Sequence, residues 1–160
     1  VLEDDAVPGS STANRLAELF EILPKAPPWD VVNLGRPPKS VHTLLSSDSC
    51  NPSVGLYHAH YPPVTTTALL WSRHGAKAFR KSHSLPIMPI DLALQSWGTK
   101  TDRILALEQP LFFSREVQST IRASSRHSGG RGIYSVLVRI RRIISNKVRA
   151  YRNRKLRRGN

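Results

Sequence analysis

Three consecutive carboxylates, Glu3, Asp4 and Asp5, follow two apolar residues at the start of the sequence. The apolar pair predicts the end of a buried strand, in which Glu3 and Asp5 would point to one side and Asp4 to the other. Carboxylates are hard oxygen ligands suited to Mg²⁺ or Mn²⁺, and ligand sites in open α/β sheets lie at the carboxyl ends of strands. A metal ion there could bind a diphosphate and stabilise the charge that develops on it as a leaving group. The simpler alternative is a polar turn that caps the next helix.

Two other pairs of polar residues have spacings that could support chemistry. Ser72 and Arg73 could contact a phosphate, although helix capping and solvation explain them equally well. His58 and His60 alternate, so a strand would place both imidazoles on one face. Polar surface, or a loop at an acceptor site, is the favoured interpretation of the histidines.

The first part of the chain contains both helix and strand patterns, and the predicted fold class is α/β, a mixed sheet with flanking helices. Ser72 is expected to be the N-cap of one helix. Asp91 is expected to be the N-cap of a second helix, which would end at Gly98. Residues 39–53 are polar, with a loop expected at residues 46–49, and the apolar residues 110–113 are expected to lie in a loop. The predicted helices are residues 12–23, 73–79 and 92–98, and the predicted strands are residues 1–2, 29–34, 54–61, 65–71 and 103–107.

The charge of the chain is concentrated at its C-terminal end. The 160 residues carry a net charge of +13, yet all 11 acidic residues lie at or before Glu116 and are balanced there by 11 Lys and Arg. The remaining 13 basic residues follow, and this distribution disfavours a uniformly basic nucleic-acid-binding domain. The single cysteine excludes an internal disulfide framework. No apolar run reaches the roughly 18 residues needed to cross a membrane.

The basic end of the chain is predicted to be an amphipathic helix over residues 133–160, joined to the body by a linker over residues 122–132. Such a helix could lie on an anionic membrane surface, bind nucleic acid, or dock on a partner or another domain. Membrane binding is favoured over nucleic acid. The apolar stripe of this helix is Ile133, Val136, Leu137, Ile140, Ile143, Ile144, Val148 and Tyr151.

Five short segments, taken in order, resemble glycosyltransferase family 25, whose members act in lipooligosaccharide biosynthesis. The resemblance spans residues 1 to about 121 and does not cover the basic tail. The segments are Val-Leu-Glu-Asp-Asp at 1–5, Trp-Asp-Val-Val-Asn-Leu-Gly at 29–35, Thr-Ala-Leu-Leu-Trp-Ser-Arg-His-Gly-Ala-Lys at 67–77, Pro-Ile-Met-Pro-Ile-Asp at 86–91 and Gln-Pro-Leu-Phe at 109–112.

The resemblance implies an incomplete GT-A-like fold, a nucleotide-sugar donor and a divalent metal, Mn²⁺ or Mg²⁺. It implies transfer of a hexose, galactose above all, from a UDP-sugar to a glycan or lipid-linked glycan acceptor. Asp5, with Glu3, would bind the metal, while Glu3 and Asp4 would contact the donor. The triplet Glu-Asp-Asp departs from Asp-x-Asp, so the division of roles between its members stays open. Asp91 is the candidate catalytic base of an inverting transfer, and the alternative is that it only caps its helix.

The resemblance also makes residues 1–121 the C-terminal part of a catalytic domain, with the nucleotide-binding half upstream. We therefore expect the 160 residues alone to be inactive or poorly folded. The expected location is cytoplasmic, and the tail could hold the protein at the inner face of a bacterial membrane. The rival hypothesis from another functional class is a non-catalytic module that binds anionic membrane or nucleic acid through the basic helix.

Overall fold

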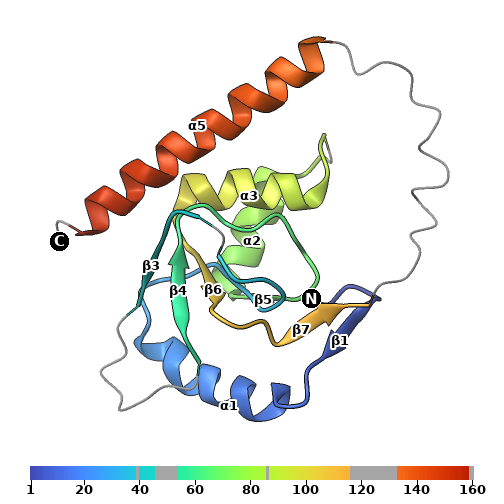
Figure 1. Ribbon diagram of the computed structural model, residues 1–160, viewed down its shortest axis with the longest axis vertical. Coiled ribbons are helices and arrows are strands. Elements are labelled where there is room, and N and C mark those ends of the chain that lie inside the picture. Colours follow the sequence, from blue (N-terminus) through green and yellow to red (C-terminus); the bar gives the residue numbers. More distant parts are fainter. Residues whose placement is uncertain (39, 46–53, 86, 116–132, 159–160) are drawn as a thin grey trace.

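The computed structural model describes residues 1–38, 40–45, 54–85, 87–115 and 133–158. These residues form an α/β structure in which helices cover both faces of a mixed five-stranded sheet (Figure 1). The predicted linker over residues 122–132 lies outside the described residues.

The predicted α/β class, a mixed sheet with flanking helices, is confirmed. The observed elements are β1 (Ala6–Pro8), α1 (Thr12–Ile22), the 3-10 helix η1 (Leu23–Lys25), β2 (Val31–Asn33), β3 (His42–Leu44), β4 (Leu56–Ala59), β5 (Leu69–Trp71), α2 (Arg73–Ser82), α3 (Ile90–Thr101), β6 (Ile104–Leu107), β7 (Phe112–Ser114) and α5 (Ile133–Arg158).

The five-stranded sheet has the order β3-β4-β6-β2-β5. β2 and β6 are parallel and form the centre, while the other neighbours are antiparallel. A separate two-stranded sheet joins β1 to β7 in antiparallel register. Three of these strands were not expected from the sequence: β1 follows the predicted strand 1–2, β3 lies in the polar segment 39–53, and β7 overlaps the predicted loop 110–113. The loop predicted at residues 46–49 lies outside the described residues.

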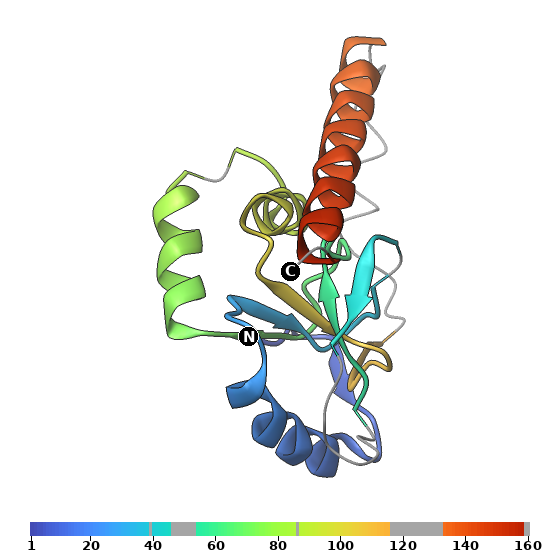
Figure 2. The ribbon, with the colours of Figure 1, turned by 90° about the vertical axis from the view of Figure 1, so that its left-hand side faces the viewer.

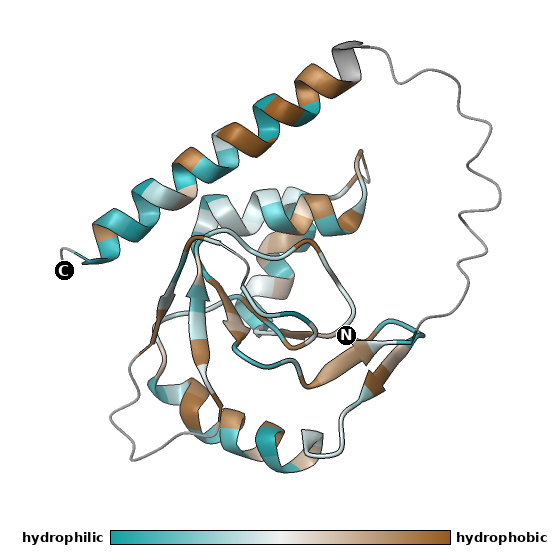
Figure 3. Ribbon diagram, in the orientation of Figure 1, coloured by the Kyte–Doolittle hydropathy of each residue, from teal (hydrophilic) through white to brown (hydrophobic). Residues whose placement is uncertain are grey.

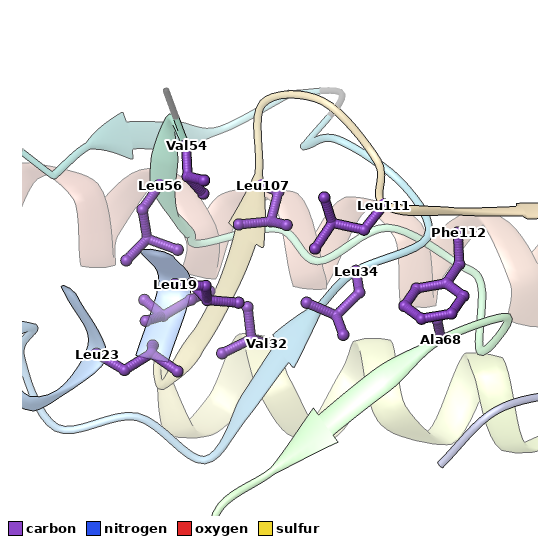
Figure 4. Close-up of a cluster of buried hydrophobic side chains, with 11 residues drawn as sticks. Leu19, Leu23, Val32, Leu34, Val54, Leu56, Ala68, Leu107, Leu111 and Phe112 are labelled. Carbon is purple, nitrogen blue, oxygen red and sulfur yellow. The ribbon is translucent and has the colours of Figure 1, made fainter. Parts of the chain in front are cut away.

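Every residue of β2 and β6 is buried, because the two faces of the sheet have separate hydrophobic cores. Val32 and Leu105 point into the core beneath α1, and Val31 and Ile104 point into the core beneath α2 and α3, as strand alternation requires. The first core is drawn in Figure 4 and consists of Leu19, Leu23, Val32, Leu34, Val54, Leu56, Ala68, Leu105, Leu107, Leu111 and Phe112.

The limits of α3 differ from the predicted ones at both ends. The helix begins at Ile90 with Pro89 in the N-cap position, so Asp91 lies inside the first turn. It continues past Gly98 to Thr101, and Asp102 ends it in the left-handed conformation with φ 53°. Gly98 is needed for close packing instead: a Cβ at this position would lie 2.4 Å from Cγ1 of Ile104.

The predicted basic helix is observed as α5, which packs on α3 (Figure 1). Although α5 has 26 residues, no helix in the described part of the chain has the length and hydropathy that a membrane span requires.

Gly75 offers a direct test of how α2 is seated on the sheet. A Cβ at this position would lie 2.3 Å from the carbonyl oxygen of Asp30, which belongs to the backbone and has little freedom to move. We expect Gly75→Ala to lower the free energy of unfolding by about 1–3 kcal/mol in urea denaturation, because the helix must shift away from the strand.

Lys77→Ala on the exposed side of α2 is the matched control and should stay within about 0.5 kcal/mol of the parent. A Gly75→Ala protein as stable as this control would contradict the close packing.

Candidate functional site

The acidic triplet follows a short segment, residues 1–3, that pairs with the outer edge of β5. The amide of Leu69 donates to the carbonyl of Val1 at 2.9 Å, and the amide of Glu3 donates to the carbonyl of Thr67 at 3.0 Å. Leu2 forms an antiparallel bridge with Ala68. The pairing with β5 thus extends the sheet beyond its five strands.

The expectation of a buried strand at residues 1–2 is wrong for this structure. The exposed fractions of Val1 and Leu2 are 79% and 56%, because the segment lies at the open edge of the sheet. Its only strand neighbour among the described residues is β5.

The direction of residues 1–3, called the edge segment from here on, decides where the three carboxylates lie. Residues 1–3 run antiparallel to β5, which itself runs antiparallel to β2. The segment is therefore parallel to β2 and β6. Glu3, Asp4 and Asp5 follow it at the end of the sheet where the carboxyl ends of those two strands lie. Open α/β sheets bind their ligands at this end, beyond the carboxyl ends of the strands.

The triplet itself is a turn rather than a continued strand. The amide of Ala6 donates to the carbonyl of Glu3 at 3.1 Å, so the alternation expected for Glu3 and Asp5 stops at Glu3. The alternative of a helix cap does not hold either, because β1 separates the acids from α1.

Hydroxyl groups, not cations, are the observed partners of these carboxylates. Thr66 donates its hydroxyl to Oε1 of Glu3, and Ser114 donates its hydroxyl to Oδ2 of Asp5. The backbone amide of Arg115 donates to the carbonyl of Asp5 at 2.9 Å. No ion pair of the triplet occurs within the described residues. Three neighbouring negative charges without a counter-cation can attract a metal ion.

A buried amide holds the strand end that faces the triplet. Asn33, at the end of β2, donates from Nδ2 to the carbonyl of Thr65 at 3.2 Å. Its Oδ1 accepts from the backbone amides of Gly35 and Arg36 at 3.1 and 2.9 Å. Asn33 therefore fixes the loop that carries Thr66. The sequence analysis did not single out Asn33, and a polar residue in an otherwise apolar strand is the signal that could have found it.

Asp91 is half-buried in the first turn of α3, where its Oδ1 accepts from the amide of Leu92 at 2.8 Å. It makes no hydrogen bond to the triplet. In Figure 1, α3 begins on the side of the molecule on which the N terminus lies. The second carboxylate oxygen of Asp91 has no hydrogen-bond partner among the described residues and is available to a proton donor.

Ser72 and Arg73 lie at the other end of the sheet. They follow the C-terminal end of β5, whereas the triplet faces Thr67, which precedes β5. The hydroxyl of Ser72 accepts from the amide of Gly75 at 2.9 Å and caps α2, as predicted, and Arg73 is exposed. The structure therefore does not bring this pair to the acidic triplet.

Asp30 is a buried carboxylate at that same end of the sheet, and the sequence analysis did not identify it. Its Oδ1 lies 2.9 Å from Nδ1 of His74 and 3.3 Å from Nε of Arg103. Its backbone carbonyl accepts from the amide of Ser72 at 3.0 Å. The residue connects β2, α2 and the start of β6, so we assign it to the stability of the fold.

A second buried polar cluster surrounds Asp102, with His58 and His60 stacked at a centroid distance of 4.6 Å. The two imidazoles share one face of the chain, as their spacing predicted, but both are buried, so the favoured interpretation as polar surface is wrong for this pair. Nδ1 of His60 lies 2.8 Å from Oδ1 of Asp102, and Nε2 of His58 lies 2.8 Å from its carbonyl oxygen. Nε of Arg157 donates to Oδ2 of Asp102 at 3.0 Å, and Nε2 of His60 lies 3.1 Å from the hydroxyl of Thr43. Asp102 thus ties the ends of β4 and α3 to α5.

Two influences act in opposite directions on the ionisation of Asp102. Burial by itself would raise the pKa of this carboxyl, but hydrogen bonds from His58, His60 and Arg157 outweigh it and hold the pKa well below its usual range. The carboxylate is therefore ionised at neutral pH.

The ligand atoms of His58, His60 and Asp102 lie within 4.8 Å of one another, as a metal site requires. The hydrogen bonds argue for a structural role. Metal binding through Nε2 of His58 would move its proton to Nδ1, which is buried and has no partner among the described residues. The guanidinium of Arg157 would also lie next to the cation. We therefore assign this cluster to the stability of the fold, although it is the one group of three close ligand atoms found among the described residues.

Comparison of the chain with protein-family models, with curated proteins and with solved structures finds no match.

The role of Asp102 can be tested with Asp102→Asn. Asparagine tolerates the left-handed backbone of this position, but the substitution removes the charge and replaces one acceptor oxygen of the carboxylate with an amide donor. We expect a loss of about 1–3 kcal/mol in the free energy of unfolding at pH 7, measured in urea. A carboxyl with a depressed pKa stabilises the fold above its unfolded pKa of about 3.9, and this contribution is lost as the pH falls through the folded pKa. The difference between parent and variant should therefore shrink below about pH 4.

Glu21→Gln, an exposed change on α1, controls for loss of one negative charge and should have little effect. A difference between parent and Asp102→Asn that grows on acidification would exclude the ion-pair account.

Proposed function

We propose that this chain belongs to a metal-dependent glycosyltransferase with a GT-A-like fold, resembling family 25. The reaction would move a hexose, galactose in the first instance, from a UDP-sugar to a glycan or lipid-linked glycan acceptor. One observation carries the proposal: the acidic triplet leaves its edge segment at the carboxyl ends of the parallel strands, and its carboxylates have no cationic partner within the described residues.

Asp5 and Glu3 are proposed to hold the divalent metal, Mn²⁺ or Mg²⁺. Their donor set fits a hard cation, because carboxylates and neighbouring hydroxyls are all oxygen ligands. The metal would stabilise negative charge on the departing diphosphate. The exposed carboxylates of Glu3 and Asp4 are proposed to contact the ribose or the donor sugar. Ser72 and Arg73 lie at the other end of the sheet, so their proposed phosphate contact gains no support.

Asp91 is proposed to act as the catalytic base of an inverting transfer. The acceptor hydroxyl would form a new bond to the anomeric carbon while the bond from that carbon to the diphosphate oxygen breaks and UDP leaves. The hydroxyl proton would pass to the carboxylate of Asp91. Helix α3, which carries this residue, is held by buried packing and by the contacts of Asp102, so the carboxylate has a rigid support.

The metal assignment predicts that the chain binds Mn²⁺ and that Asp5→Asn weakens this binding. Loss of one charged ligand should raise the dissociation constant by about tenfold or more, measured by electron paramagnetic resonance of free Mn²⁺. Glu3→Gln should have an effect in the same direction.

The control variants are Glu21→Gln and Asp102→Asn, which remove a carboxylate from α1 and from the His58–His60 cluster respectively. Equal weakening by Asp102→Asn would move the metal to the histidine cluster. The absence of any Mn²⁺ binding by the parent would refute the assignment to the triplet.

The base assignment predicts that Asp91→Asn lowers the rate of hexose transfer from a UDP-sugar by about 100-fold or more, with unchanged Mn²⁺ affinity. The assay uses the protein as it is expressed from its own gene and follows release of UDP. Asn retains the acceptor oxygen that bonds the amide of Leu92, so α3 should stay intact by circular dichroism. Near-normal turnover by this variant would show that Asp91 is only a structural residue.

A further inference from the structure

Helix α5 docks on the body through a polar face. Asn146 donates from Nδ2 to the hydroxyl of Ser96 at 3.2 Å, and Asn153 donates from Nδ2 to the carbonyl of Thr99 at 3.0 Å. Ala150, between them, is fully buried. Arg157, which donates to Asp102, is the fourth residue of this face. The four residues are spaced three or four positions apart and so lie on one side of the helix.

The apolar stripe of α5 is turned away from this docked side. At about 100° per residue, the middle of the stripe lies about a third of a turn from the line through Asn146 and Ala150. Leu137 and Ile144 both have exposed fractions of 57%. Val136, Val138, Ile140, Val148, Tyr151 and Leu156 are exposed as well.

The exposed apolar residues gather on the half of α5 that extends away from the body. Figure 2 shows the part of the helix nearest Ile133 projecting beyond the sheet and the other helices, while the part nearest Arg158 lies against the body. In Figure 3 the projecting half is the more hydrophobic one, and the docked half is largely hydrophilic. A projecting helix with unburied isoleucine, leucine and valine needs an apolar partner.

The charge of α5 restricts what that partner is. Residues 133–158 contain ten Lys and Arg and no acidic residue. Two copies of this helix packed together would place these charges side by side without compensation, which disfavours a second copy of the chain. Nucleic acid would satisfy the charges but would leave the apolar stripe in water. An anionic bilayer suits both the apolar stripe and the positive charges. The stripe would be buried at the boundary between headgroups and acyl chains, and the anionic headgroups would attract Arg141 and Arg152 beside it.

We propose that α5, docked on α3 through Asn146, Ala150 and Asn153, presents its apolar stripe to an anionic membrane surface and lies along it. The body therefore reaches the membrane without any spanning segment among its described helices, on an arm that is part of its own fold. This inference does not depend on glycosyl transfer, and vesicle binding without Mn²⁺ binding would leave it standing while refuting the proposed function.

The test is flotation of the 160-residue protein with vesicles of phosphatidylcholine alone and of phosphatidylcholine with phosphatidylglycerol. We expect binding to the anionic vesicles, which weakens as salt is raised, and little binding to the neutral ones. The double variant Leu137→Gln with Ile144→Gln should weaken binding at least about tenfold, because two apolar groups no longer enter the bilayer. Arg141→Gln with Arg152→Gln should also weaken binding by about tenfold or more.

Matched control variants replace the same kinds of side chain, exposed apolar or basic, outside α5. Phe20→Gln with Leu85→Gln replaces two exposed apolar side chains outside α5, and Arg80→Gln with Lys81→Gln removes two charges from α2. Both should bind vesicles like the parent. All the substituted side chains are exposed, and circular dichroism should report an unchanged fold.

Four results would overturn the proposal. Equal binding to neutral and anionic vesicles would show that the membrane charge does not direct the contact. Equal loss in the control variants would show that α5 is not the contact. Tight binding to duplex DNA that the Leu137→Gln and Ile144→Gln variant leaves unchanged, without vesicle binding, would assign the helix to nucleic acid. A dimer that this variant dissociates, again without vesicle binding, would assign the stripe to a second copy.

Discussion

The parallel pairing of β2 with β6 is the constraint on which the rest of the structure depends. Both strands are buried on both faces, so the chain must supply a layer of helix on each side of the sheet. The layers come from α1 on one side and from α2 and α3 on the other. Each fully buried Val, Leu or Ile contributes about 1.5–3 kcal/mol, so burial of Val31, Val32, Ile104, Leu105 and Leu107 stabilises this pair of strands strongly.

The same pairing gives the sheet a polarity that the site uses. Since β2 and β6 run in one direction, their carboxyl ends lie at the same end of the sheet. The edge segment runs in this direction too, because it is antiparallel to β5, which is antiparallel to β2. Acidic and hydroxyl groups gather there, at Glu3, Asp5, Thr66 and Ser114. At the opposite edge, Asp30 and Ser72 are used to hold α2. The proposed site and the residues that hold α2 thus lie at different ends of one sheet.

Asp102 connects this sheet to the basic helix. Its left-handed backbone ends α3, and its carboxylate accepts hydrogen bonds from His60 on one side and from Arg157 on the other. The carboxylate of Asp102 is half-buried, whereas the side chain of Arg157 is 38% exposed, so this contact orients α5 together with the buried face of Asn146 and Ala150. The orientation leaves the apolar stripe outside, and a detachable tail would not have presented one fixed face.

How much of this was predictable depends on whether a feature is local. Helices α1, α2 and α5 were predicted because apolar spacing and the cap at Ser72 lie within a few residues of one another. The end of α3 was misplaced, since Gly98 has the usual sign of a helix terminus but is a close contact with Ile104. β3 was missed because it has only three residues, two of them polar, and is held by pairing with β4, not by an alternating pattern of its own.

The amino-acid sequence by itself determined the acidic triplet, the apolar stripe and the separation of charge between body and tail, since each is a property of neighbouring residues. Only the tertiary structure decided that Glu3 lies beside Thr66, that Asp102 joins His60 to Arg157, and that α5 turns its stripe outward. These contacts connect residues from 42 to 63 positions apart. Packing of the whole chain chooses such partners, and no local pattern records the choice.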